Sequence, residues 1–155
     1  MFKSIKDLFK TNSVSQEPDE QQLRLAAATL MFELIRSDGR INTVELIYMK
    51  DILKREFLLD EEEVEQLAKR AKETAYEATS LQGFTREICD NWGNAKRTKL
   101  LEYLWILAMT DNEVDRHERH LVRKVAGLLY LNDTEIIIAH ENAKKQLGIK
   151  NNLSH

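Results

Sequence analysis

Two stretches of this chain carry the same pattern of residues. They read LMFELIRSDGRINTVE at residues 30–45 and YLWILAMTDNEVDRHE at residues 103–118, so the second lies 73 positions after the first. In each stretch an apolar run leads into a short acidic turn, and a glutamate follows the turn at the same spacing. Helical amphipathicity alone aligns apolar positions in many pairs of sequences, but it does not place acidic residues around the same turn. We interpret the pattern as an internal duplication.

The gapless alignment extends well beyond the two turns. Residues 30–72 fall on residues 103–145, and apolar residues fall on residues of the same kind. The pairs include Phe57 with Tyr130, Leu58 with Leu131, Asp60 with Asp133, Glu62 with Glu135 and Val64 with Ile137. The sequence therefore predicts two copies of a three-helix unit, whose equivalent turns we expect to meet in a two-fold arrangement.

Composition and apolar spacing indicate an all-α protein. The chain has 155 residues, of which 43% are hydrophobic and 32% charged, and it contains Gly 5 and Pro 1. All-β and doubly wound α/β domains need more turn residues than this. Helical spacing predicts helices over about residues 19–36, 85–91, 96–109, 116–129 and 134–147, with two more between residues 40 and 83 that Asp60 separates. We expect a single-domain helical bundle of about seven helices.

The two ends of the chain differ from the predicted bundle. Residues 1–18 are expected to form a short amphipathic helix and a polar linker, with Phe2, Ile5, Leu8 and Phe9 on one helical face. This segment either docks its apolar face on the domain or rests weakly on an anionic membrane surface through residues 1–10. We assign residues 19–149 to the helical domain and residues 150–155 to a tail. No apolar stretch reaches the roughly 18 residues that a membrane-spanning helix needs.

Charge and cysteine content narrow the range of functions. Lys+Arg 23 against Asp+Glu 26 gives a net charge of -3, which argues against a nucleic-acid-binding protein. The single cysteine, Cys89, excludes an internal disulfide and a cysteine-based zinc site, and it fits a cytoplasmic location. Four basic residues of one predicted helix form a patch that we interpret as a solvated face rather than an anion site: Arg116, Arg119, Arg123 and Lys124. Neither a glycine-rich phosphate loop nor a Ser/His/Asp pattern is present, so nothing in the sequence supports an enzyme.

The order of an aliphatic helix, the motif Asp-Gly-x-aliphatic-x-x-x-Glu and an amphipathic helix resembles the TerB-like family, which is named for the tellurite-resistance protein TerB. The motif stands at residues 38–45, and the second copy resembles the family over residues 100–131. The resemblance covers nearly everything after residue 18. It implies an all-helical bundle and a non-catalytic protein of bacterial stress response, including resistance to tellurium oxyanions. We expect such a protein to act through protein partners in the cytoplasm, or peripherally at the inner face of the membrane.

The resemblance also implies a metal site. The acidic turn residues of the family are proposed to hold a metal ion, most often taken to be calcium. The matching positions in this chain are Asp38, Glu45, Asp111 and Glu118. Oxygen ligands of this kind suit Ca²⁺ or Mg²⁺ rather than a soft metal. Asn112 stands where the family has a glycine after the second aspartate.

Helix capping is the alternative explanation of the same residues. Residues 42–45 and 115–118 each fit a capping box, in which the first residue caps the helix and the glutamate bonds back to it. Asp38 and Asp111 can equally be turn formers that accept hydrogen bonds from nearby backbone amides. Two functions therefore stay open: a stress-response protein that binds a divalent cation, and a metal-free interaction or co-chaperone-type scaffold.

Overall fold

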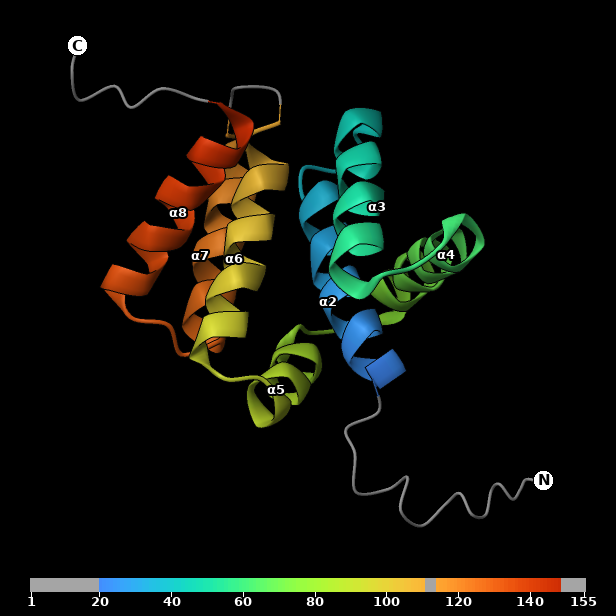
Figure 1. Ribbon diagram of the computed structural model, residues 1–155, viewed down its shortest axis with the longest axis horizontal. Helices are drawn as coiled ribbons and strands as arrows, with labels where there is room; N and C mark the ends of the chain where they lie inside the picture. Colours follow the sequence, from blue (N-terminus) through green and yellow to red (C-terminus); the bar gives the residue numbers. More distant parts are fainter. Residues whose placement is uncertain (1–19, 111–113, 149–155) are drawn as a thin grey trace.

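The computed structural model describes residues 20–110 and 114–148, and this part of the chain contains helices but no strand (Figure 1). The helices are α2 (Glu20–Ile35), α3 (Thr43–Phe57), α4 (Glu61–Glu77), α5 (Gln82–Asn91), α6 (Asn94–Ala108), α7 (Arg116–Leu128) and α8 (Asp133–Leu147). This confirms the predicted all-α bundle. The predicted amphipathic helix and linker at residues 1–18 and the tail at residues 150–155 lie outside the described residues, so the domain boundaries stay predictions.

The helices form two units of three, as the duplication predicts. Figure 1 shows α2, α3 and α4 on one side of the molecule, α6, α7 and α8 on the other, and α5 beside them at one end. Within the units, α2 packs most extensively on α4, and α6 packs most extensively on α8. Between the units, α2 packs on α6, α2 touches α7, and α3 touches α6. These reciprocal contacts are what a two-fold relation between the units produces.

The two first helices of the units, α2 and α6, make the centre of the core. Both carry consecutive buried residues rather than a single apolar stripe, which is the pattern of a helix covered on most sides. Leu34 of α2 and Leu107 of α6 occupy equivalent positions, and both are fully buried. No helix in the described part of the chain combines the length and the apolar character needed to cross a membrane.

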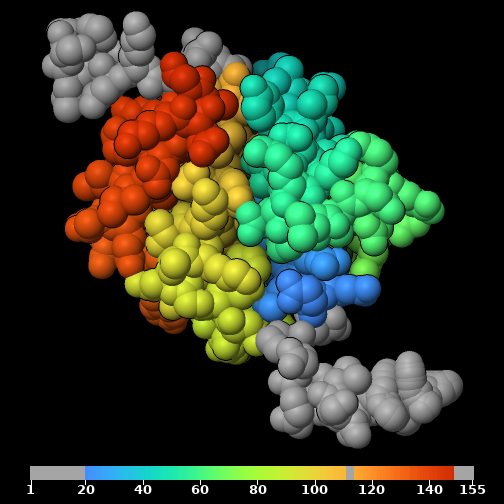
Figure 2. All heavy atoms as spheres, in the orientation of Figure 1, coloured from blue at the N-terminus to red at the C-terminus, as the bar shows by residue number. Residues whose placement is uncertain are grey.

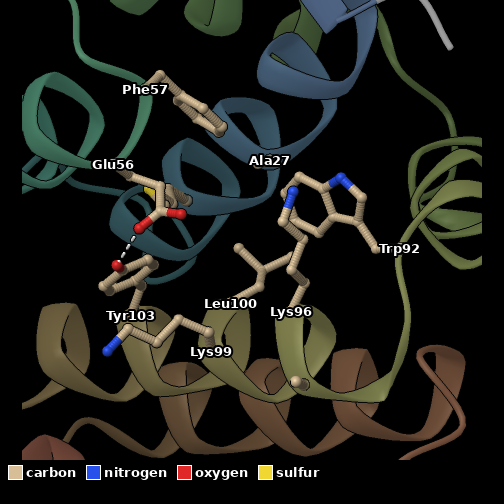
Figure 3. A pocket seen from close by; sticks show the side chains of 10 residues that line it. Ala27, Glu56, Phe57, Trp92, Lys96, Lys99, Leu100 and Tyr103 are labelled. Atoms are coloured by element: carbon tan, nitrogen blue, oxygen red, sulfur yellow. Dashed lines mark hydrogen bonds between the residues drawn. The ribbon is translucent and has the colours of Figure 1, made fainter. Parts of the chain in front are cut away.

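A seam between the units runs where α3 faces α6, and it crosses the face shown in Figure 2. The hydroxyl of Tyr103 on α6 donates a hydrogen bond to a carboxylate oxygen of Glu56 on α3 (Figure 3). Burial and this carboxylate raise the pKa of Tyr103 above its usual value, so the phenol stays a hydrogen-bond donor further into the alkaline range. An apolar cavity of about 270 Å³ lies beside this bond, and Lys96 lies over the ring of Trp92 next to it.

The predicted alignment of the two copies is wrong after the second helix of each unit. Helices α3 and α7 begin 73 positions apart, as expected, but α7 has 13 residues against 15 in α3. Reciprocal capping boxes then fix the next helix starts at Asp60 with Glu63 and at Asn132 with Glu135. Asp60 is therefore equivalent to Asn132 and not to Asp133.

Burial supports the corrected register. Val64 is 2% exposed, whereas Ile137, its partner in the gapless alignment, is 60% exposed. Ile136 packs against the core and is the true equivalent of Val64. Since an α-helix turns about 100° per residue, a slip of one position moves a side chain from the core to the surface.

The fourth predicted helix begins earlier than expected. Helix α5 starts at Gln82, so Gly83 lies in its first turn rather than in a break. The break lies instead between Glu77, where α4 ends, and Leu81. A glycine is tolerated near a helix start, because the first amides of a helix have no intrahelical partner to lose.

Mutation of the two equivalent leucines tests the assignment of the core. We expect Leu34→Ala and Leu107→Ala each to lower the free energy of unfolding by about 2 to 5 kcal/mol, because each change leaves a cavity at a buried site. Chemical denaturation followed by circular dichroism measures this change. Ile47→Ala, at a position 62% exposed on α3, is the control. A loss in the control as large as in the core variants would contradict the assignment of the core.

Candidate functional site

The two acidic turns meet at one end of the bundle, the upper end in Figure 1. They line a single cavity of about 440 Å³, which we call the acidic cavity. Its lining residues are Ile35, Asp38, Arg40, Ile41, Asn42, Glu45, Val114, Asp115 and Glu118. Three pairs among them are equivalent in the two copies: Ile41 with Val114, Asn42 with Asp115, and Glu45 with Glu118. The two-fold arrangement thus builds one cavity from both turns, as the sequence predicts.

The first turn is shaped by backbone hydrogen bonds to short polar side chains. Asp38 Oδ1 accepts a bond from the amide of Arg40 at 3.0 Å. Between them Gly39 has a φ of 89°, a left-handed conformation that residues with a Cβ rarely adopt. Asn42 Oδ1 accepts from the amides of Val44 and Glu45 at 2.9 and 3.2 Å and so caps α3. Asp38 is therefore a turn former, as the capping interpretation expects.

The second turn contains the predicted capping box. Asp115 Oδ1 accepts from the amide of His117 at 2.6 Å, and the amide of Asp115 donates to Glu118 Oε1 at 3.4 Å. The backbone N–H of His117, aided by its ring, lowers the pKa of the Asp115 carboxyl. A negative charge is therefore stabilised at the start of α7, where the helix dipole also favours it.

Two glutamates of the acidic cavity, Glu45 and Glu118, are almost completely buried. Glu45 is 2% exposed and Glu118 is 5% exposed, although glutamate is rarely buried to this extent. Each lies in the first turn of its helix, three residues after the cap. The reciprocal capping box predicted at both helix starts forms at residues 115–118, whereas at residues 42–45 only the Asn42 side chain caps the helix. Arg40 is the cationic side chain among the lining residues. Burial of carboxylates is costly unless positive charge or hydrogen bonds compensate for it.

The donor chemistry of this cavity fits a hard cation. Its acidic lining offers oxygen atoms only, which is the ligand type that Ca²⁺ and Mg²⁺ prefer. Within residues 20–110 and 114–148, no three His, Cys, Asp or Glu side chains are grouped closely enough to hold a metal ion. Asp111, the fourth predicted ligand, lies outside the described residues. The structure thus brings Asp38, Glu45 and Glu118 to one cavity.

The structure also adds residues that the sequence did not assign to a site. The sequence predicts Asp115 only as a helix cap, yet it lines the acidic cavity as well. Its equivalent in the first copy, Asn42, lines the same cavity. The alignment of the two copies could have identified both residues. They cap helices at equivalent turns, so they come close to each other when the two turns meet. Arg40 has no equivalent positive charge in the second copy, where the acidic residue Glu113 takes its place in the sequence.

A family model described as tellurite resistance protein TerB matches residues 24–141. This chain belongs to the TerB family. The match runs from α2 into α8 and so includes both copies of the three-helix unit and both turns of the acidic cavity. The TerB family and its all-helical fold are in general non-enzymatic.

One solved structure extends the comparison to the fold. A crystal structure of a protein of unknown function from Porphyromonas gingivalis is similar with a TM-score of 0.62 and 19% sequence identity. The similarity covers 83% of this chain and 98% of the other. At this identity it shows a shared fold and nothing more. No curated protein matches the chain.

The Asp115 cap gives a prediction for acidic pH. Because the pKa of Asp115 is lowered in the folded state, its charge stabilises the fold above the unfolded pKa of about 3.9 and this contribution is lost as the pH falls further. Asp115→Asn keeps the capping oxygen and removes the charge. We expect the variant to melt below the wild type at pH 7 and the difference to close below pH of about 4.

Melting curves between neutral and acidic pH measure this difference. Asp90→Asn makes the same change of charge at an exposed position at the end of α5 and serves as the control. If the melting temperature of Asp115→Asn differs from that of the wild type by the same amount at every pH, the charge of Asp115 does not contribute to the stability.

Proposed function

We propose that this TerB-family protein is a non-catalytic stress-response module that binds one Ca²⁺ or Mg²⁺ between its two acidic turns. One observation carries the proposal: Glu45 and Glu118 are buried at equivalent positions of two copies and line a single acidic cavity. Helix capping concerns each glutamate only at the start of its own helix, whereas a shared cation gives a role to the presence of both buried carboxylates in one cavity. A cation shared by both turns uses both, and Asp38 and Asp111 complete an oxygen-only ligand set.

In this proposal the bound cation holds the two three-helix units together, because the acidic cavity lies between them. The carboxylates belong to the starts of α3 and α7 and to the turns before them, which are parts of different units. A cation that contacts carboxylates of both turns favours the conformation in which the units are together. It therefore stabilises the fold by mass action, since the unfolded chain does not bring these groups together.

The surface of α3 next to the acidic cavity supports a protein partner. Ile41, Val44, Ile47 and Tyr48 are apolar residues at helical spacing that are between 38% and 62% exposed. The equivalent positions of the second copy are Val114, His117, His120 and Leu121, so the second copy has histidines at two of the four positions. Large apolar side chains grouped on a surface are typical of protein-interaction sites. Binding of the cation at the start of α3 would set the position of this face.

Two further parts of the proposal concern location. The single cysteine supports action in the cytoplasm. Weak association of residues 1–10 with an anionic membrane surface is a separate proposal, and it predicts that deletion of these residues abolishes co-sedimentation with anionic vesicles.

A metal-free interaction scaffold is the second candidate function. The reciprocal bonds between Asp115 and Glu118 favour it, because they give Glu118 a structural role without any cation. The two candidates differ in their response to calcium.

A cation titration separates them. We expect Ca²⁺ to raise the stability of the wild type by about 2.7 kcal/mol when its free concentration is about a hundred times Kd, and the melting temperature to rise accordingly. Asp38→Asn with Asp111→Asn should abolish the rise, because it removes one ligand from each turn. Asp51→Asn with Asp90→Asn makes the same change of charge on exposed faces of α3 and α5, and this control variant should still show the rise in melting temperature.

Either of two results would overturn the cation proposal. The first is an unchanged melting temperature of the wild type at millimolar Ca²⁺ and Mg²⁺, which the metal-free scaffold predicts. The second is an equal rise in both double variants, which would place the cation elsewhere on the protein.

A further inference from the structure

A third cavity lies between α6, α7 and α8 and has a volume of about 520 Å³. Its lining residues are Trp105, Val114, Arg119, Arg123, Asp133, Ile136, Ile137 and His140, and we call it the basic cavity. We propose that the basic cavity binds a small organic anion, with an apolar body and one phosphate or carboxylate head. The volume is within the range of typical small-molecule sites.

Two arginines supply the charge. Arg119 and Arg123 are four residues apart, so they lie one above the other on the same face of α7. Within residues 20–110 and 114–148, neither arginine forms an ion pair, whereas other basic residues do, for example Lys50 with Glu65. Asp133, at the start of α8, is the carboxylate of the lining. Two guanidinium groups against one carboxylate leave an excess of positive charge, and guanidinium binds phosphate and carboxylate by paired hydrogen bonds.

Two aromatic side chains, Trp105 and His140, lie side by side in the wall of the basic cavity. The ring of His140 packs edge-on against Trp105 with centroids 4.5 Å apart. Burial first, then the charges of Lys144, Arg119 and Arg123, lower the pKa of His140 against the opposite effect of Glu141. Trp105 is 5% exposed, and its indole Nε1 has no hydrogen-bond acceptor in the described part of the chain. Because Nε1 is itself buried, its N–H signal reports on the packing of the Trp105 ring rather than on direct contact with a ligand.

The first copy shows what this region looks like without the site. With the corrected register, Trp105, Arg119, Arg123 and His140 correspond to Phe32, Leu46, Lys50 and Ala68. Phe32 has no N–H donor, Leu46 packs against the core, and Lys50 bonds Glu65 at 3.1 Å. Helices α3 and α4 also approach each other more closely than α7 and α8 do. The fold therefore needs neither the open cavity nor its polar groups, and both are properties of the second copy.

The apolar walls specify the other half of the ligand. Ile136 and Ile137 of α8 and Val114 before α7 line the cavity beside the arginines. Ile137 is 60% exposed, which leaves apolar surface for a ligand to cover. An inorganic anion would contact the arginines alone, whereas an amphipathic anion covers both kinds of surface. The patch on α7, interpreted from the sequence as a solvated face, is in this proposal one wall of a binding site.

Phenyl phosphate is a suitable probe, because it joins a phosphate head to a flat apolar body. Its titration is followed by the indole N–H signal of Trp105 and the ring signals of His140 in NMR spectra. We expect saturable shifts at both residues and a rise in the pKa of His140, since a bound anion offsets the positive charges beside it. Inorganic phosphate should bind at least about tenfold more weakly, and phenol should not bind, because each lacks one half of the recognised chemistry. Benzoate in place of phenyl phosphate distinguishes a carboxylate head from a phosphate head.

Matched variants test where the probe binds. Arg119→Gln with Arg123→Gln changes two exposed side chains, so the fold should remain, which circular dichroism checks. Binding should fall at least about tenfold in this variant. Lys50→Gln with Arg55→Gln removes the same charge from α3 and should leave binding unchanged. Equal loss in the two variants, equal affinity for phenyl phosphate and inorganic phosphate, or no saturable shift at Trp105 and His140 would each overturn the proposal.

Discussion

The packing of α2 against α6 is the contact on which the rest of this structure depends. Each helix is the centre of its own three-helix unit, and each is buried on most sides only because the other unit covers it. Their contact fixes the two-fold relation between the units, and the two-fold relation in turn brings the turn after α2 to the turn after α6. The acidic cavity is therefore a consequence of core packing, because neither unit could build it alone.

After duplication the two copies share a core but not a surface. Both keep a capping residue and a buried glutamate at the start of the second helix, where the units meet. Around this shared centre they differ: the first copy has an exposed apolar face on α3, and the second has a basic cavity between α7 and α8. In our account the shared centre binds a cation, and the two divergent surfaces give the protein different partners on its two sides.

Much of the fold can be predicted from the sequence, because apolar spacing, few glycines and clear capping residues all indicate helices. The register between the two copies cannot be predicted from the sequence. The consecutive apolar residues Ile136, Ile137 and Ile138 fit either alignment, and only the packing in the structure shows which alignment is correct. The site is predicted where it follows from the duplication, as for Glu45 and Glu118. Asp115 was missed as a wall of the cavity because a cap explains it locally. The basic cavity was missed because Trp105 and His140 come from helices other than the one that carries the arginines.

The central claim is that the two copies build a single cation site, and calcium stoichiometry tests it most directly. Equilibrium dialysis with radioactive calcium measures the number of ions bound per chain. The account predicts one Ca²⁺ per chain in the wild type, and loss of that site in Glu45→Gln and in Glu118→Gln alike, although each variant alters only one copy. Two equal sites per chain, half the binding retained in each variant, or no bound calcium would contradict it.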